Sequence, residues 1–267
     1  MLIGLKRYIV RILTGIRLPF GFVLFKGPFS YNKDLLTTRV NCDFCNDPHF
    51  RESYKLGAKT LSIFDTKKAS LFLYGEWRVY ICCWAAERAK ELEGDFVECG
   101  VNSGFLSRPA MNYIDFKSMN DRKFYLFDTY CGIPEEQISA SEKKLGIVES
   151  NIKLYSHDIY DDVKDTFKDF DNAVLIKGIV PDTLPQAKTD RVCYLSIDMN
   201  CVIPEVAALE YFWDKLVPGA LVILDDYGFS AGNSGYINQK LAIDAFASRR
   251  GTSVLSLPTG QGLMIKA

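Results

Sequence analysis

Three aspartates at the ends of two apolar runs are the residues of this sequence best suited to chemistry. Asp225 and Asp226 close the run ALVILDD, and Asp198 closes the earlier run RVCYLSID. Three carboxylates about 4–5 Å apart would repel one another by several kcal/mol at an effective dielectric constant of about 20. Either a divalent cation relieves this repulsion or one acid takes a proton. Oxygen ligands favour magnesium or calcium over zinc, and a cation held there could orient and acidify a hydroxyl group.

The adjacent pair of aspartates needs a bend in the chain to serve one ion. Neighbouring side chains on a strand point to opposite faces, and Tyr227-Gly228 is a suitable place for the chain to leave the strand. Adjacent strands lie about 4.8 Å apart, so Asp198 can reach the same point from the strand beside it. The alternative is that one aspartate of the pair only caps or supports the backbone.

A second group of candidates lies in GDFVECGVNSGFLS, between an apolar run and a helical pattern. Glu98 is followed by Gly100, Asn102, Ser103 and Gly104. Glycines let the backbone turn tightly and approach a ligand, and Asn102 or Ser103 would start the helix with free N–H groups facing a pocket. The spacing E-x-G-x-x-x-G differs from the G-x-G-x-x-G of dinucleotide-binding proteins. A cofactor-binding turn and a purely structural turn both remain open.

Asp128 closes the next apolar run along the chain, KFYLFD. An acid at the end of the second strand of such a sheet commonly binds the two hydroxyls of a ribose, although Asp also favours turns and caps. Because a glycine turn lies one strand earlier, we favour the ribose.

The elements that position these residues alternate along the chain. Runs rich in Val, Ile, Leu, Phe and Tyr predict buried strands at 95–100, 123–128, 173–178, 191–198 and 220–226. Helical patterns occupy 71–94, 103–117, 140–170, 204–215 and 236–250. This alternation predicts an α/β fold with a doubly wound, mostly parallel sheet. Runs at 252–258 and 263–267 add a terminal antiparallel hairpin, which makes seven strands.

The acids of both groups follow the ends of predicted strands. In an open parallel sheet, ligands bind in the crevice outside the carboxyl ends of the strands. The pattern therefore predicts that these acids meet along one edge of the sheet: Glu98, Asp128, Asp198, Asp225 and Asp226.

The composition predicts a chain that buries a large core. Its 267 residues are 48% apolar by type, and the formal net charge of −1 gives no indication of a nucleic-acid surface. The eight cysteines are scattered, several of them in apolar runs, which predicts free thiols in a reducing compartment rather than disulfides. We therefore expect a cytoplasmic protein without a nucleic-acid partner.

The first 70 residues differ from the rest, so we divide the chain into a cap at 1–70 and a core at 71–267. Residues 1–26 contain five basic residues, no acid and many large apolar groups, without an apolar stretch long enough to span a membrane. Such a segment would dock on the domain or a neighbouring subunit, or contact an anionic membrane surface. Residues 28–70 are turn-rich and polar, which predicts a loop-dominated cap. Cys42, Cys45 and His49 supply too few ligands for a structural zinc site, so we expect a loop over the active site there.

The order of these motifs resembles that of the macrocin O-methyltransferase (TylF/MycF) family of class I S-adenosylmethionine-dependent methyltransferases. The matching segments, between residues 75 and 267, are GDFVECGVNSG, YLFDTYCGIP, IKGIVPDTLP, LSIDMN and PGALVILDDYG. The resemblance implies that Glu98, Gly100 and Gly104 shape the methionine side of the pocket for S-adenosylmethionine. It implies that Asp128 holds the ribose of this cofactor.

The resemblance also implies a metal-assisted reaction. Asp198, Asp225 and Asp226 would bind a divalent cation, usually magnesium, that holds the hydroxyls of the substrate, and Asp198 would be the general base. One segment departs from the family pattern: where D-G-D-x-Y is common, this chain has Asp198-Met-Asn200-Cys-Val202. The departure weakens the expectation of metal dependence and of a particular substrate class.

The sequence thus predicts an enzyme that transfers a methyl group from S-adenosylmethionine to a hydroxyl of a small molecule, such as a sugar, a glycoside or a secondary metabolite. We expect a homo-oligomer in which the first 70 residues contribute to a subunit interface. Three rival hypotheses remain. They are a nicotinamide-dependent oxidoreductase on a similar sheet, a non-catalytic cofactor-binding protein, and a membrane-surface enzyme that acts on a lipid-linked glycan.

Overall fold

The structure is a computed structural model that describes residues 29–34, 36–65, 69, 75–229 and 237–267. The chain divides into two compact units, Met1–Cys42 and Asp43–Ala267. In the first unit, strands β1 (Tyr31–Lys33) and β2 (Leu36–Thr38) pair antiparallel. The basic segment at 1–26, with its predicted docking or membrane contact, lies outside the described residues. Within the described ranges, no helix has both the length and the apolar character needed to cross a membrane.

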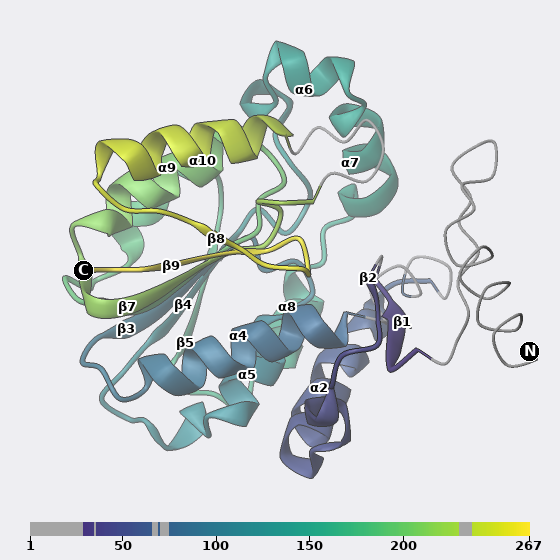
Figure 1. Ribbon diagram of the computed structural model, residues 1–267. Helices are drawn as coiled ribbons and strands as arrows, with labels where there is room; N and C mark the ends of the chain where they lie inside the picture. The colour runs from purple at the N-terminus through teal and green to yellow at the C-terminus, as the bar shows by residue number, and fades with distance from the viewer. Residues whose placement is uncertain (1–28, 35, 66–68, 70–74, 230–236) are drawn as a thin grey trace, which may run out of the picture. The chain divides into compact units, whose positions relative to one another are not determined.

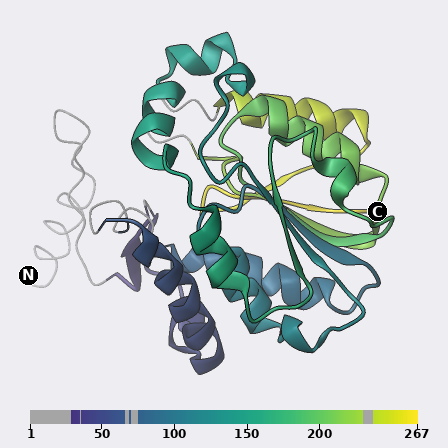
Figure 2. The ribbon, with the colours of Figure 1, turned by 180° about the vertical axis from the view of Figure 1, so that it is seen from behind.

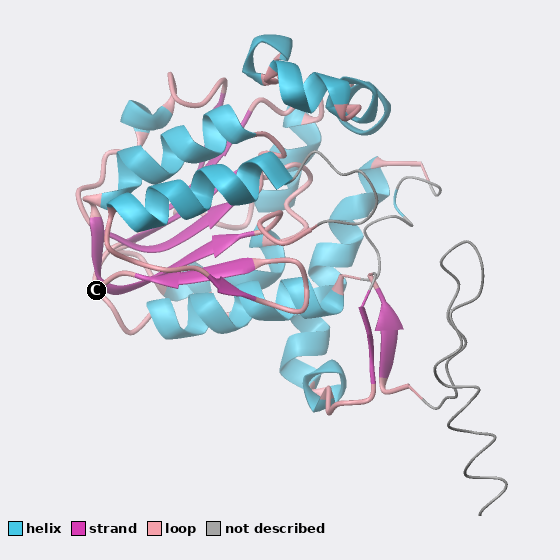
Figure 3. Ribbon diagram, turned by 45° about the horizontal axis from the view of Figure 1, so that its top comes forward, coloured by secondary structure: helices cyan, strands magenta, loops and turns pink. Residues whose placement is uncertain are grey.

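The second unit is built around a seven-stranded sheet (Figures 1 and 3). Its strands are β3 (Asp95–Cys99), β4 (Phe124–Asp128), β5 (Ala173–Lys177), β6 (Val192–Ile197), β7 (Leu216–Leu224), β8 (Leu255–Ser256) and β9 (Gly262–Ile265). The order across the sheet is β5-β4-β3-β6-β7-β9-β8. The first five strands in this order run parallel, and β9 runs antiparallel to both β7 and β8. The predicted doubly wound, mostly parallel sheet with a terminal antiparallel hairpin is confirmed.

Helices cover both faces of this sheet. The α-helices are α2 (Pro48–Thr60), α4 (Glu76–Ala89), α5 (Ser107–Tyr113), α6 (Ala140–Lys144), α7 (Ile147–Tyr155), α8 (Tyr160–Phe167), α9 (Val202–Trp213) and α10 (Ile237–Arg249). Short 3-10 helices are η2 (Asp43–Asn46), η3 (Leu61–Ile63), η4 (Phe116–Ser118), η5 (Glu135–Gln137) and η6 (Leu184–Gln186). One face packs against α4, α5 and α8, and the other against α9 and α10 (Figures 1 and 2). Every residue of β6 is buried, as expected for a strand between two helical layers.

Two predicted helices are shorter or more divided than the sequence suggests. The prediction of a helix at 103–117 is wrong at both ends, because α5 spans only Ser107–Tyr113. Asn102 and Gly104 have φ angles of 49° and 88°, a left-handed conformation that an α-helix cannot include. The region 140–170 forms three helices rather than one, and Gly146, with a φ of 84°, separates the first two.

The prediction of a loop-dominated segment at 28–70 is wrong for helix α2. Asp47 caps this helix by accepting a hydrogen bond from the N–H of Phe50 over 2.8 Å, and Pro48 occupies its first turn. The buried face contains only one large apolar side chain, Phe50, which is why the segment reads as polar. A Cβ at Gly57 would lie 2.6 Å from the Pro109 side chain, so a glycine lets α2 pack closely on α5.

Candidate active site

The carboxyl ends of β6 and β7 bring three carboxylates together. These strands are parallel, and Ile197 pairs with Leu224 in their register, so the residues that follow emerge at the same level. The N–H of Asp225 donates to the carbonyl oxygen of Ile197 over 2.9 Å. One ligand oxygen from each of Asp198, Asp225 and Asp226 lies within 4.8 Å of the others. We call these three residues the carboxylate cluster.

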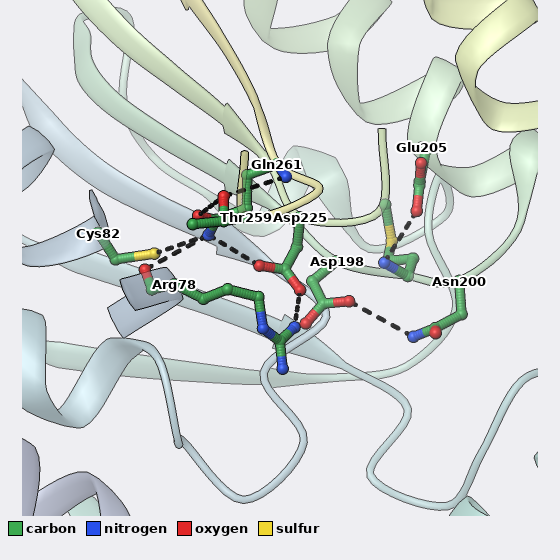
Figure 4. A network of polar contacts seen from close by, with 9 residues as sticks. Arg78, Cys82, Asp198, Asn200, Glu205, Asp225, Thr259 and Gln261 are labelled. Atoms are coloured by element: carbon green, nitrogen blue, oxygen red, sulfur yellow. Dashed lines mark hydrogen bonds and ion pairs between the residues drawn. The ribbon is translucent and has the colours of Figure 1, made fainter. Parts of the chain in front are cut away.

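Two side chains from distant parts of the chain hold Asp225 (Figure 4). Its side chain is 1% exposed, and Arg78 of α4 donates to Oδ2 in an ion pair. Gln261 Nε2 donates to Oδ1 over 2.9 Å and to the carbonyl oxygen of Arg78 over 3.3 Å. A guanidinium of the protein itself therefore offsets part of the repulsion between the paired aspartates. Neither partner was predicted from the sequence, although a cation within the nearly apolar pattern RVYICCWAA was a signal for Arg78.

The other two carboxylates have fewer partners. Asp226 is 8% exposed, and its Oδ2 accepts no hydrogen bond from the described residues. Asp198 is partly exposed, and the Asn200 amide donates to it from 3.5 Å. Burial raises the pKa of Asp198 and of Asp226 well above the ordinary value, and the charge of Asp225 raises both further. The charge of Arg78 acts in the opposite direction on both without reversing the shift.

The turn after β6 is held by a buried acid, Glu205, whose role was not predicted from the sequence. Glu205, in the first turns of α9, accepts hydrogen bonds from the N–H of Met199 over 3.1 Å and from Gln239 Nε2 over 2.7 Å. Burial raises the pKa of Glu205 to about 8. Asn200 has a φ of 59°, so this turn folds back toward Asp198 through a left-handed residue.

The two glycines of the turn after β3 have different structural roles. Gly100 has a φ of 93°, and a Cβ there would lie 1.9 Å from the carbonyl oxygen of Asp198. Gly100 thus allows the glycine turn and the carboxylate cluster to touch. A Cβ at Gly104 would lie 2.7 Å from Cζ of Phe167, so this glycine serves the packing of α8. We define the glycine turn as residues 100–104.

Glu98 and Asp128 flank the glycine turn and differ in their partners. Glu98 is 1% exposed, and neither carboxylate oxygen makes a hydrogen bond of good geometry with the described residues, although the nearby Ser107 hydroxyl favours its charged form. Burial raises the pKa of Glu98 to about 8. Asp128 Oδ2 accepts from the N–H groups of Val101 and Asn102 over 2.7 Å each, and Oδ1 accepts from the N–H of Tyr130 over 2.6 Å. Asp128 therefore holds the glycine turn, and the buried Glu98 is suited to a positively charged ligand group.

A family model described as macrocin O-methyltransferase (TylF) matches residues 65–248. This range is more than half of the chain and contains both the glycine turn and the carboxylate cluster. The chain belongs to the macrocin O-methyltransferase family.

Two curated O-methyltransferases are similar to this chain in sequence. The 8-demethyl-8-(2,3-dimethoxy-alpha-L-rhamnosyl)-tetracenomycin-C 4'-O-methyltransferase of Streptomyces olivaceus is 27% identical over 158 residues, 56% of this chain and 59% of that protein. The demethyldecarbamoylnovobiocin O-methyltransferase of Streptomyces niveus is 27% identical over 140 residues, 50% of this chain and 53% of that protein. The chain thus spans little more than half the length of these relatives.

Solved structures show the same fold. The O-methyltransferase NovP aligns with a TM-score of 0.62 at 22% identity, over 73% of this chain and 81% of that one. A calicheamicin methyltransferase aligns with a TM-score of 0.55 at 16% identity, over 82% of this chain and 93% of that one. These likenesses confirm a class I methyltransferase fold for this member of the macrocin O-methyltransferase family.

Ser103 and His49, which were singled out in the sequence, both contact other side chains away from the carboxylate cluster. Ser103 is fully buried, and its hydroxyl lies 3.0 Å from that of Thr60 in α2, so its side chain packs between elements rather than starting a helix. The ring of His49 stacks on Tyr113 with centroids 4.3 Å apart. Among the described residues, the carboxylate cluster is the one group of three or more acidic, Cys or His side chains arranged to hold a metal ion.

Proposed function

We propose that this protein transfers a methyl group from S-adenosylmethionine to a hydroxyl of a small molecule, with a sugar or glycoside as the acceptor. The observation that carries the proposal is the contact between the glycine turn and the carboxylate cluster at one edge of the sheet. Family membership supports the same reaction. The names of the two curated relatives, one of them acting on a rhamnosyl group, support a glycosidic acceptor.

The residues around the glycine turn fit the charged end of the cofactor. The buried Glu98 offers two oxygens to an ammonium group, and Gly100 and Gly104 keep the backbone of the turn in its left-handed conformation. Asn102 and Ser103 would contribute through their backbone. Asp128 would receive the ribose hydroxyls on the side of its carboxylate that the turn leaves accessible. Bound S-adenosylmethionine would supply an electrophilic methyl group on a sulfonium sulfur.

The carboxylate cluster would prepare the acceptor hydroxyl. Its carboxylate oxygens are ligands that Mg²⁺ prefers. Oδ2 of Asp226 accepts no hydrogen bond from the described residues, and coordination of such a cation would supply the partner. A bound divalent cation would orient the substrate hydroxyl and lower its pKa. Asp198, Asp225 and Asp226 would hold this ion, and Asp198 would act as the general base.

The proposed reaction is a single displacement at the methyl carbon. The acceptor oxygen forms a bond to the methyl carbon while the bond from that carbon to sulfur breaks, which leaves S-adenosylhomocysteine. The hydroxyl proton passes to Asp198 and then to water. The protein chiefly aligns oxygen, carbon and sulfur in one line. Asn200, at the position where an acid is common in the family, cannot accept this proton, which leaves Asp198 as the proton acceptor in the turn after β6.

The proposal is tested by binding and turnover in parallel. Calorimetric titration should show binding of S-adenosylhomocysteine and none of NAD or NADP. Incubation of the protein with S-adenosylmethionine, Mg²⁺ and a panel of rhamnosides and other glycosides should yield a product heavier by one CH₂ unit. Binding of NAD alone would contradict the proposal, as would cofactor binding without methylation across the panel. Full activity after chelation would remove the cation from the mechanism.

Three expectations about the surroundings of the enzyme stay predictions. We expect copies of the chain to associate, residues 1–26 to dock or to contact anionic membranes, and the protein to be cytoplasmic. Light scattering after size exclusion tests the first. Flotation with anionic liposomes, with and without residues 1–26, tests the second.

A further inference from the structure

Arg78 places a permanent positive charge inside the carboxylate cluster. Its guanidinium pairs with Asp225, and Figure 4 shows it pointing toward the carboxylates of Asp225 and Asp198. Its side chain is only 15% exposed. An arginine side chain keeps its proton at any pH at which the protein is folded. The cluster therefore never presents three uncompensated carboxylates.

The position of this charge is set by the fold. Arg78 lies in the first turn of α4, and this helix packs against β6 and β7, the strands that carry the cluster. Gln261 donates to both the carbonyl oxygen of Arg78 and the carboxylate of Asp225. Thr259 in turn donates its hydroxyl hydrogen to Oε1 of Gln261 over 2.9 Å, which fixes the orientation of that amide. The ion pair is thus built into the site and does not depend on a flexible surface side chain.

We propose that Arg78 is the built-in counter-cation of the carboxylate cluster, and that it weakens the binding of a divalent cation there. With the three acids ionised, the guanidinium leaves a net charge of −2, which one divalent ion neutralises. Without Arg78 the net charge would be −3, and the same ion would bind more tightly. This inference rests on the proposed function, because it concerns the cation that the proposed reaction uses.

The test compares cation binding by the full-length protein and two variants. Mn²⁺ replaces Mg²⁺ as the probe, because the paramagnetic resonance signal of free Mn²⁺ reports binding without any turnover. Arg78→Gln keeps a hydrogen-bond donor but removes the charge, and should bind Mn²⁺ at least about tenfold more tightly than the wild type. Arg78→Lys keeps the charge and should stay within about threefold. Arg88→Gln, an exposed arginine of the same helix, is the matched control and should leave the affinity unchanged.

A second measurement uses thermal unfolding. Removing one partner of a buried ion pair is destabilising, so Arg78→Gln should unfold at a lower temperature than the wild type in a chelator. Saturating Mg²⁺ should raise its melting temperature by more than it raises that of the wild type. If Arg78→Gln does not fold, the nitrogen resonances of the Arg78 guanidinium, assigned by their loss in Arg78→Lys, should shift during a Mg²⁺ titration of the wild type.

The outcomes separate this inference from the proposed function. Equal or weaker Mn²⁺ binding by a folded Arg78→Gln, with binding by the wild type, overturns the role of Arg78 alone. Unmoved guanidinium resonances at saturating Mg²⁺ overturn it as well. Absence of binding by both proteins removes the cation from the proposed function and this inference with it, while methyl transfer is judged by its own assay. Binding by the variant alone supports the inference in its strongest form.

Discussion

Asp128 and Asp225 both lie at the carboxyl end of a parallel strand in one sheet, yet different kinds of partner hold them. Asp128 accepts three hydrogen bonds from backbone N–H groups, two of them in the glycine turn, and a longer one of 3.5 Å from the Thr129 hydroxyl. Asp225 accepts from two side chains, and one of these is a cation. Backbone donors are present whatever the residue type, whereas the donors to Asp225 depend on two specific residues.

Under the proposed function, the difference separates a rigid cofactor side, made of the glycine turn and Asp128, from an adjustable acceptor side, made of the carboxylate cluster with Arg78 and Gln261. On the cofactor side, the backbone of the glycine turn supplies two of the donors to Asp128. A change of side chain in this turn therefore alters the charge around Asp128 only a little. On the acceptor side, a single substitution at Arg78 or Gln261 changes the charge or the orientation of the carboxylate cluster. We infer that methyl-donor binding is insensitive to the substitutions that tune the acceptor side.

The largest effect is expected at the residue where the two sides touch. Gly100→Ala would place a Cβ 1.9 Å from the carbonyl oxygen of Asp198, at a φ of 93°. Neither backbone can move aside, because the N–H of Asp198 also donates to the carbonyl oxygen of Cys99 over 2.8 Å. We expect a loss of about 4 kcal/mol or more in the free energy of unfolding by urea, and no binding of S-adenosylhomocysteine.

The matched control for this variant is Gly251→Ala. Gly251 also has a positive φ, 66°, but no atom of the described residues lies within 4 Å of the position of its Cβ. Gly251→Ala should therefore lower the free energy of unfolding by only about 1 kcal/mol and leave cofactor binding intact. Similar losses in both variants would mean that the backbone conformation, and not the contact between the two sides, sets the cost.

The next effect separates the two sides by function. Asp198→Asn removes the proposed proton acceptor and should lower kcat by about a thousandfold, while the affinity for S-adenosylhomocysteine stays within about threefold. Asp190→Asn, an exposed position at the other end of β6, is the control and should keep full activity. Loss of cofactor affinity together with activity would show that Asp198 supports the glycine turn rather than the chemistry.

A third prediction concerns the buried acid of the cofactor side. Glu98 has a pKa of about 8 in the folded protein, against an ordinary value of 4.5. The folded state therefore holds a proton that the unfolded chain has lost, so this contribution to stability is full below the lower value and disappears as the pH rises toward the higher one. Glu98→Gln is neutral at every pH. At about pH 9 it should be more stable than the wild type by on the order of 3 kcal/mol in urea denaturation.

The same variant should bind S-adenosylhomocysteine at least about tenfold more weakly, because the ammonium group of the ligand loses its counter-charge. Glu91→Gln, exposed just before β3, should change neither quantity. A wild-type stability that does not fall relative to Glu98→Gln between about pH 5 and pH 8 would show that this proton does not reside on Glu98.

The contrast between the two sides also explains how much of this site could be predicted from the sequence. Strand ends were predictable because buried parallel strands are continuous apolar runs, and their register brings Asp198 beside Asp225. The ion pair of Arg78 was not predictable, because Arg78 lies 147 residues from Asp225 and meets it only through the packing of α4 on the sheet. Gln261 reaches the same carboxylate from the loop before β9, and no spacing rule connects the two.

The prediction of secondary structure from the sequence also failed at helix α2 and in the segment 140–170. Helix α2 was missed because its buried face carries Ser53, Gly57 and Thr60 beside Phe50, a pattern without the usual apolar stripe. The start of α2 was marked by the capping residue Asp47 followed by Pro48, but the polar composition of the segment outweighed this signal. The segment 140–170 was predicted as one helical region, and the break between its first two helices falls at Gly146, which has a φ of 84°.

The smallest expected effect tests whether Ser103 belongs to the cofactor side at all. The Thr60 hydroxyl donates to the carbonyl oxygen of Gly57 over 2.8 Å, so in its contact with Ser103 it must be the acceptor. Ser103→Ala removes that donor and should cost about 1 kcal/mol of stability. The affinity for S-adenosylhomocysteine should stay within about twofold, because the hydroxyl points toward α2.

A double-mutant cycle with Thr60→Val makes this last prediction specific. If the two hydroxyls interact only with each other, the second substitution should cost less in the Ser103→Ala background than in the wild type, with a coupling of about 1 kcal/mol. Cofactor affinity should remain unchanged throughout the cycle. A loss of affinity in Ser103→Ala without any coupling to Thr60 would place the Ser103 hydroxyl in the cofactor pocket. The cofactor side would then depend on a particular side chain, as the acceptor side does, and the contrast between the two would fail.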